Sequence, residues 1–458
     1  MTITTRTAMA ALGLSLLPGL AHADAEQLEA DLRGALAGEG ELTIGDVSDA
    51  LLGGSTTAEE LSLSGTAGEK MTVARYIVEG DYDDPDEVIL EGVSMIEEGT
   101  NVKVDRLVFD SPGQAVLDLG DLSYSVDNPL EGLSLEGLVL DQIAGMANSD
   151  LPFGVEGGRI ELQSLSATDL SDEAIGSLTL SGLTGSGDNL GDLGAGTFSL
   201  PSLSLSGLTG MDTDSPTMDA LEFSDLDIAT EKLVATLGHL VADGNMEDGE
   251  YSGSMEALNL DLAKMIELAP AEERTNLRLV SNVLTGGSGQ LSLDADMDGT
   301  WEADGANGQM GSRFSMTAAD AFRFAFDSDV PVQLPKGQDP AEYFAGIDDW
   351  TELNTLGGEL STTLSDLGVF ARIAPVVAAT QGMSEGEFLE QARTQAEGFG
   401  IMMGPKIGEV LSGIVSMMAG EASEMSVHLN LPPSAEFQKL AQDPLGLPEA
   451  LSMQVDVE

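Results

Sequence analysis

Cysteine is absent from this 458-residue chain, which excludes disulfide bonds, thiolate metal ligands and cysteine nucleophiles. Aromatic residues make up only 4%, with two tryptophans, which disfavours a cleft that stacks sugars on aromatic rings. Basic residues are few as well, because 18 Lys and Arg stand against 79 Asp and Glu, a formal net charge of −61. Nucleic acid and anionic membranes repel such a chain, so we expect no nucleic-acid partner.

The acidic residues are spread along the whole chain rather than gathered in one segment. This distribution favours adaptation to salty water, where screening makes an acidic surface tolerable. Cation binding is the alternative explanation, and composition alone leaves both open.

A long hydrophobic run is also missing, since no segment after the N-terminus holds 18 uncharged apolar residues. We therefore expect no transmembrane segment in the mature chain. The short apolar run 8–20 follows Arg6 and precedes Ala21-His22-Ala23, a small-x-small cleavage site. These features predict a secretory signal peptide, 1–23, cleaved after Ala23. An exported chain without disulfides, and without a cysteine after the cut to carry a lipid anchor, indicates the bacterial periplasm.

One phrase recurs in the sequence: SLTLSGLTG starts at residue 177 and SLSLSGLTG at residue 202. Looser L-x-L-x-G-L copies start at residues 61, 88 and 133, and a copy at residue 221 has Asp225 in the glycine slot. Alternation of apolar and polar residues predicts half-buried strands, and the glycine predicts a bend or bulge. We expect a β-dominated α+β fold with a long antiparallel, meander-like sheet. Its leucine side must be covered by a second sheet, by helices near the C-terminus or by lipid.

The chain order predicts five regions. They are the signal peptide 1–23, an N-terminal helical segment 24–60, a repetitive β region 61–230, a mixed helix and hairpin region 231–335, and a helical cover with closing strands 336–458. Within them we expect strands over 115–126 and 359–371, and helices over 231–240, 341–353 and 434–443. The sequence VKVDRLVFD at 102–110 alternates with a one-residue slip, which predicts a bulge.

Catalytic motifs are lacking: there is no G-x-S-x-G elbow, no HExxH and no P-loop. His239 and His428 are far apart in sequence, and His428 sits in an alternating strand pattern, which favours a structural histidine. We expect a protein that is not an enzyme and needs no cofactor. A carboxylate pair for glycoside hydrolysis is a weaker alternative, because sequence cannot select a pair among 79 acids.

Asp294, Asp296 and Asp298 form the one string that resembles a metal site, since D-x-D-x-D-G opens an EF-hand loop that binds Ca²⁺. Gly305 stands where that loop requires Glu. The same alternation also fits a strand whose aspartates face water, so the Ca²⁺ site is one of two interpretations.

The helix expected over 406–418 is strongly apolar and flanked by methionines. Its apolar stripe either packs on the sheet as core or forms a pliable lid over an acyl chain. The candidate ligand-lining residues are Leu135, Leu180, Leu205, Ile414 and Met418.

The signal, the L-x-L-x-G-L strands, Trp301 after a D-G turn and the ending SEMSVHLNLPPSAEFQKLAQDP…LSMQVDVE resemble a group of exported alphaproteobacterial proteins of unknown function. More distantly, leucine-rich β repeats behind a signal resemble AsmA-like envelope proteins, whose β grooves hold lipid chains. That resemblance of architecture implies lipid binding, although those proteins keep a membrane anchor.

The functional expectation is an exported, non-enzymatic periplasmic protein that binds a lipid or another apolar ligand between sheet and helices. The alternative is a structural or interaction protein of the cell envelope with a self-packed sheet. A Ca²⁺-dependent binding protein or a carboxylate hydrolase is the weaker alternative.

Overall fold

A computed structural model gives the fold of the chain. It describes residues 18–36, 40–50, 54–65, 69–97, 99–117, 124–126, 128–143, 155–213, 216–244, 249–304, 307–334, 354–433 and 447–458. The chain divides into two compact units, Met1–Thr230 (unit 1) and Glu231–Glu458 (unit 2). Each unit is described by itself.

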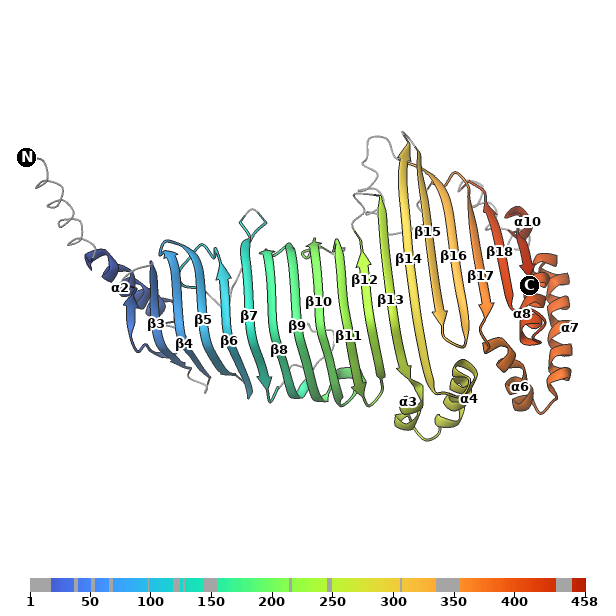
Figure 1. The fold of residues 1–458 in the computed structure, drawn as a ribbon, viewed down its shortest axis with the longest axis horizontal. Coiled ribbons are helices and arrows are strands. Elements are labelled where there is room, and N and C mark those ends of the chain that lie inside the picture. The colour runs from blue at the N-terminus through green and yellow to red at the C-terminus, as the bar shows by residue number, and fades with distance from the viewer. Residues whose placement is uncertain are drawn as a thin grey trace, which may run out of the picture. The chain divides into compact units, whose positions relative to one another are not determined.

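Unit 1 is an open antiparallel meander in which each strand from β3 to β11 pairs with the next one along the chain (Figure 1). Most of these sequential strands are joined by short connections, and the longer connections are 111–129 before β7 and 142–155 before β8. The short strands β1 and β2 both pair with β3. The elements are α2 Pro18–Ala35, β1 Glu41–Thr43, β2 Val47–Asp49, β3 Ser55–Ser64, β4 Lys70–Asp81, β5 Asp84–Glu97, β6 Thr100–Asp110, β7 Leu130–Asp141, β8 Glu156–Leu170, β9 Ala174–Asn189, the 3-10 helix η2 Gly191–Leu193, β10 Gly196–Thr209 and β11 Ala220–Thr230.

Unit 2 is a second open antiparallel meander, and it carries most of the helices (Figure 1). Its elements are β12 Val234–Asp243, β13 Glu250–Asp261, α3 Leu262–Leu268, α4 Arg274–Thr285, β14 Gln290–Asp304, β15 Asn307–Ala318, β16 Phe322–Gln333, β17 Gly358–Asp366, α6 Val369–Gln381, α7 Glu385–Met403, α8 Pro405–Met418, β18 Glu424–Leu431, α10 Leu447–Ala450 and β19 Gln454–Val457. The predicted fold class, β-dominated α+β with a long antiparallel meander and helices mostly in the C-terminal part, is confirmed.

The strands of unit 1 share a kink at matched positions. Pairing is interrupted at a matched position within each strand from β3 to β11, yet the register is the same on both sides of it, because the neighbouring strand kinks as well. In the odd-numbered strands the residue at this position has a left-handed backbone conformation, with positive φ, and in the even-numbered strands it does not. The residues at this position, from β3 to β11, are Glu60, Ala74, Gly92, Asp105, Gly137, Gln163, Gly182, Pro201 and Asp225.

The kink explains the recurring phrase. Leu178 and Leu180 share a face with Leu183 because Gly182, at φ +66°, shifts the alternation by one residue. Asp225 stands in the glycine slot with φ +56°, a conformation that Asp tolerates better than most residues. Pro201 lies inside β10 at an unpaired position, so its lack of an N–H group removes no hydrogen bond between strands. The slip predicted at 102–110 is therefore a kink shared by paired strands, without a change of register.

The helix predicted over 231–240 is wrong, because β12 occupies this stretch. The same kink is the cause. Leu237 pairs with Leu258 and His239 with Glu256, while Gly238 is left unpaired between them. The shift places apolar residues three apart, as at Leu237 and Leu240, and this spacing imitates one face of a helix.

Other sequence predictions need correction. The strand predicted over 115–126 does not form at 115–117, where Ala115 and Leu117 instead pack on the sheet. The strand predicted over 359–371 ends at Asp366, whose carboxylate accepts the N–H groups of Gly368 and Phe370 and so starts α6. The predicted helical segment 24–60 holds α2, but strands begin at Glu41. The helices expected over 341–353 and 434–443 lie outside the described residues.

Candidate ligand-binding surfaces

Two rows of apolar side chains cross the sheet of unit 1 on one face, which we call the leucine face. Within each row every residue pairs directly with the next, strand by strand, so the side chains lie about 5 Å apart. One row is Ala58, Tyr76, Leu90, Leu107, Leu135, Leu165, Leu180, Leu203 and Phe223. The other is Val78, Val88, Phe109, Leu133, Ala167, Leu178, Leu205 and Leu221.

The first strands of the leucine face are covered by the chain itself. Leu90 and Phe109 are almost completely buried in one cluster with Ala115 and Leu117, which follow β6. Tyr76 fixes this segment, because its hydroxyl donates to the carbonyl of Ala115 at 2.8 Å and accepts from the N–H of Leu117 at 3.2 Å. Burial raises the pKa of Tyr76, so the phenol stays neutral and able to donate.

From β7 to β11 the leucine face is half-buried. The predicted residues Leu135, Leu180 and Leu205 lie here in two neighbouring rows, so the structure brings these three together on one face. Ile143 and Leu190 lie in a buried cluster with Phe198, near one end of these strands. The long helix of unit 1 does not cover this part, because α2 packs on β2 and β3.

Ile414 and Met418 belong to α8 of unit 2, whereas the three leucines belong to unit 1. Helix α8 packs on β18 and β19, and Gly413 lies against Met425 and Val457. A Cβ at Gly413 would come 2.8 Å from the Met425 sulfur, so the helix and the sheet are in close contact. This packing favours the interpretation of α8 as core. Of the five predicted ligand-lining residues, Leu135, Leu180 and Leu205 therefore share one face of unit 1, and the other two belong to a helix of unit 2.

Asp294, Asp296 and Asp298 lie in the continuous strand β14, not in an EF-hand loop. Alternate residues of a strand lie roughly 7 Å apart, so the three carboxylates do not converge on one point. Asp294 accepts the N–H of Ala257 at 2.8 Å, where β13 bulges against β14. Arg313 lies 3.8 Å from Asp298. Among the described residues no group of three or more His, Cys, Asp or Glu is placed to hold a metal ion.

The two strand histidines are also apart. His239 pairs with Glu256 between β12 and β13. His428 pairs with Ser361 and Gln454 and lines a shallow polar concavity of about 640 Å³ over β14 to β19. That concavity has both acidic and basic lining residues, with Arg313 placed between the carboxylates of Asp298 and Asp327.

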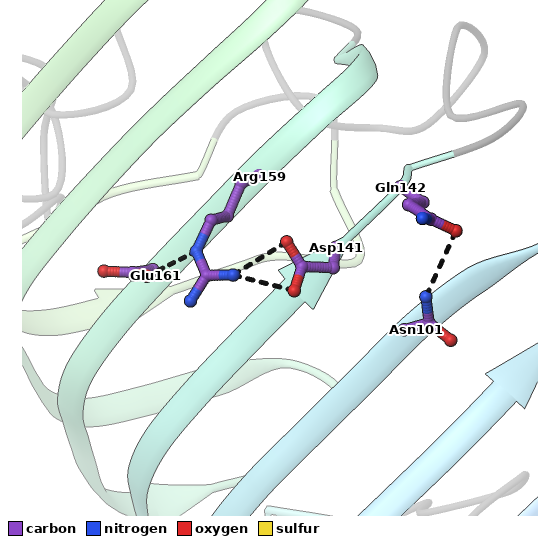
Figure 2. A network of polar contacts seen from close by, with 5 residues as sticks. All are labelled: Asn101, Asp141, Gln142, Arg159 and Glu161. Carbon is purple, nitrogen blue, oxygen red and sulfur yellow. Dashed lines mark hydrogen bonds and ion pairs between the residues drawn. The ribbon is translucent and has the colours of Figure 1, made fainter.

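The few basic residues connect acidic side chains of neighbouring strands. In Figure 2, Arg159 lies between Asp141 and Glu161, and its guanidinium donates to both oxygens of Asp141 at 2.8 and 2.7 Å. The two carboxylates raise the pKa of Arg159, with Glu161 first. Nearby, the Asn101 amide donates to Gln142 at 3.4 Å. Exposed pairs of this kind contribute little stability, but they relieve repulsion between acids.

An apolar cavity of about 850 Å³ lies in unit 2, and sequence reasoning missed it. Helices α3 and α4 provide most of its lining, including Met265, Ile266, Leu277 and Val280. Leu277 and Val280 are 38% and 53% exposed although α4 is an amphipathic helix. An apolar helix stripe that faces a cavity instead of a sheet has the same sequence pattern as a core helix.

No protein-family model matches the chain, and no curated protein matches it. In the parts of the chain that the structure describes, no helix combines the length and the apolar character needed to cross a membrane.

Proposed function

We propose that this is an exported, non-enzymatic protein that holds a lipid or another apolar ligand between sheet and helices. The α3–α4 cavity carries the proposal. Its volume, about 850 Å³, lies within the roughly 300–1,000 Å³ of typical ligand pockets, and its lining is mainly apolar. Helix α3 contacts β12 and β14, and the residues that line the cavity come from α3, α4 and the segments next to them.

The polar groups of the cavity favour a ligand with an acidic end. Lys232 and Arg274 both belong to the lining, in a chain with only 18 basic residues, and the lining also includes one acid, Glu231. Arg274 is oriented by a 2.8 Å hydrogen bond from its Nε to the Ala269 carbonyl. An apolar body in contact with Leu277 and Val280, and an anionic group near the two cations, is the chemistry of a fatty acid or an acidic lipid.

Binding of cis-parinaric acid, a fluorescent fatty acid, tests the proposal. Val280→Glu places a carboxylate in the apolar lining, and we expect the affinity to fall at least about tenfold. Asn282→Glu on the same helix is the matched control, because Asn282 is exposed and does not line the cavity. Equal affinity for both variants, or no binding by the unaltered protein, would argue against the cavity as the site.

The N-terminus supports export. Cleavage after Ala23 leaves Leu28 and Leu32, the buried residues of α2, in place. Burial raises the pKa of the Asp24 carboxyl, and the charges of Asp49, Asp81 and Asp83 add to this effect. A new α-ammonium group at residue 24 would bring positive charge to this acidic neighbourhood. N-terminal sequencing of the protein recovered from a producing cell's envelope fraction should begin at Asp24.

A structural or interaction protein with a self-packed sheet is the second candidate. The observation that favours it is the cover that the chain places on its own leucine face through Tyr76, Ala115 and Leu117. Native mass spectrometry separates the two candidates. Co-purified lipid favours ligand binding, and a protein that carries no lipid and ignores cis-parinaric acid favours the structural role.

A further inference from the structure

The α7–α8 hairpin ends in four exposed apolar side chains. Phe399, Ile401, Met402 and Met403 are 47%, 87%, 72% and 42% exposed, and we call them the apolar tip. Helices α7 and α8 lie side by side, and Gly404, at φ +106°, reverses the chain between them (Figure 1). The tip is therefore a convex end of a helix pair and not the wall of a groove.

The hairpin is tightly packed just below the tip. Gly400 and Gly408 face each other, and a Cβ built on either would lie about 3 Å from the Cα of the other. This close approach of the two backbones fixes the direction of the tip. The exposed side chains therefore cannot turn inward to pack on α8, because no space is left between the helices at this point.

The tip is also free of acid in a very acidic chain. Residues 398–408 contain no Asp or Glu and one cation, Lys406, whereas 79 of the 458 residues of the chain are acidic. The nearest acids along the chain are Glu397 and Glu409, and Lys406 is paired with Glu409 at 2.6 Å. Water-facing positions elsewhere in the chain are rich in acid, so this composition points to an apolar environment for the tip.

We infer that the apolar tip inserts into the surface of a lipid bilayer. The exposed fractions of the four residues add up to about two and a half side chains. At roughly 200 Å² for each large side chain, the exposed apolar area is roughly 500 Å². A standard protein interface needs about 800 Å² from each partner and a complementary shape, so the tip is too small for one. A fluid bilayer needs no complementary shape, and methionines adapt to it readily. This inference is independent of the α3–α4 cavity.

The net charge of the chain determines which lipid headgroups favour its binding to a membrane. The net charge of −61 repels anionic membranes, so insertion is expected into zwitterionic phosphatidylcholine and is weakened when phosphatidylglycerol is added. Salt should restore binding to the mixed vesicles, because it screens repulsion without affecting apolar contacts.

Labelling tests the inference directly. The chain has no cysteine, so Ile401→Cys provides a single site for the environment-sensitive dye NBD. Added phosphatidylcholine vesicles should shift its emission to the blue, whereas Val126→Cys, at an exposed apolar position of unit 1, should show no shift. In flotation with the same vesicles, the double variant Ile401→Ser, Met402→Ser should bind about 100-fold more weakly, since each buried side chain is worth a factor of roughly ten.

Two results would overturn the inference. One is NBD emission that is unchanged by phosphatidylcholine vesicles at every salt concentration. The other is a dimer in sedimentation velocity that the double variant dissociates, which would assign the tip to a second copy of the chain. Both substituted residues are strongly exposed, so the variants are expected to fold normally.

Discussion

Tyr76→Phe tests whether the chain covers its own leucine face. The substitution preserves the ring, which is 95% buried, and removes the hydroxyl that joins Ala115 and Leu117 to the sheet. It leaves one buried carbonyl and one buried N–H without a partner. Each such group costs about 1–3 kcal/mol, so the free energy of unfolding should fall by about 2–6 kcal/mol.

Urea denaturation followed by circular dichroism measures this loss, and hydrogen exchange locates it. The Leu117 amide should lose its protection in the variant, because its acceptor is gone. Tyr124→Phe is the control: Tyr124 packs on the same cluster, and its hydroxyl forms no hydrogen bond with other described residues. A Tyr76→Phe protein with unchanged stability and an equally protected Leu117 would refute the proposed role of this segment.

Three further predictions concern stability. Tyr76 and Tyr82 have pKa values raised above the usual value of about 10, mainly by burial, so the native state keeps protons that the unfolded state loses. Stability should therefore fall above pH 10 by about 1.4 kcal/mol per pH unit for each tyrosine, and thermal melts of the single Phe variants should show a shallower decline. Gly182→Ala should cost about 1 kcal/mol in urea denaturation because of the left-handed backbone, whereas Thr184→Ala on the same strand should change stability by less than about 0.5 kcal/mol. Arg372 donates to three carbonyls, two of them in the last turn of α4, and Arg372→Met should lower stability by about 3 kcal/mol in a calorimetric scan.

The strands of unit 1 could be predicted because their signal is local. Leu178 and Leu180 alternate with small polar residues, and alternation in sequence is alternation of faces in a strand. The row from Leu135 to Leu180 then follows from the antiparallel pairing of sequential strands. The glycine slot predicted a bend, and Gly182 occupies a left-handed conformation there.

Contacts between distant segments could not be predicted in the same way. Ala115 and Leu117 alternate as a strand would, yet they pack on the sheet as an irregular cover held by Tyr76. Gly238 creates a helix-like spacing inside β12. The exposure of Val280 depends on how α3 and α4 pack. The sequence of an amphipathic helix shows which side is apolar, but it does not show what that side contacts.

The recurring phrase encodes the architecture of unit 1. Residues that function requires are therefore better sought outside the phrase. Its glycine slot accepts Asp225, and the facing position accepts Gln163 or Pro201, so the slot requires a backbone conformation and not a chemical group. A repeat under such a constraint builds a sheet and needs no ligand to explain it. Departures from the repeat are then the more informative features. Two exposed apolar surfaces among the described residues, near Val280 and Ile401, lie on helices of unit 2, where the phrase is no longer present.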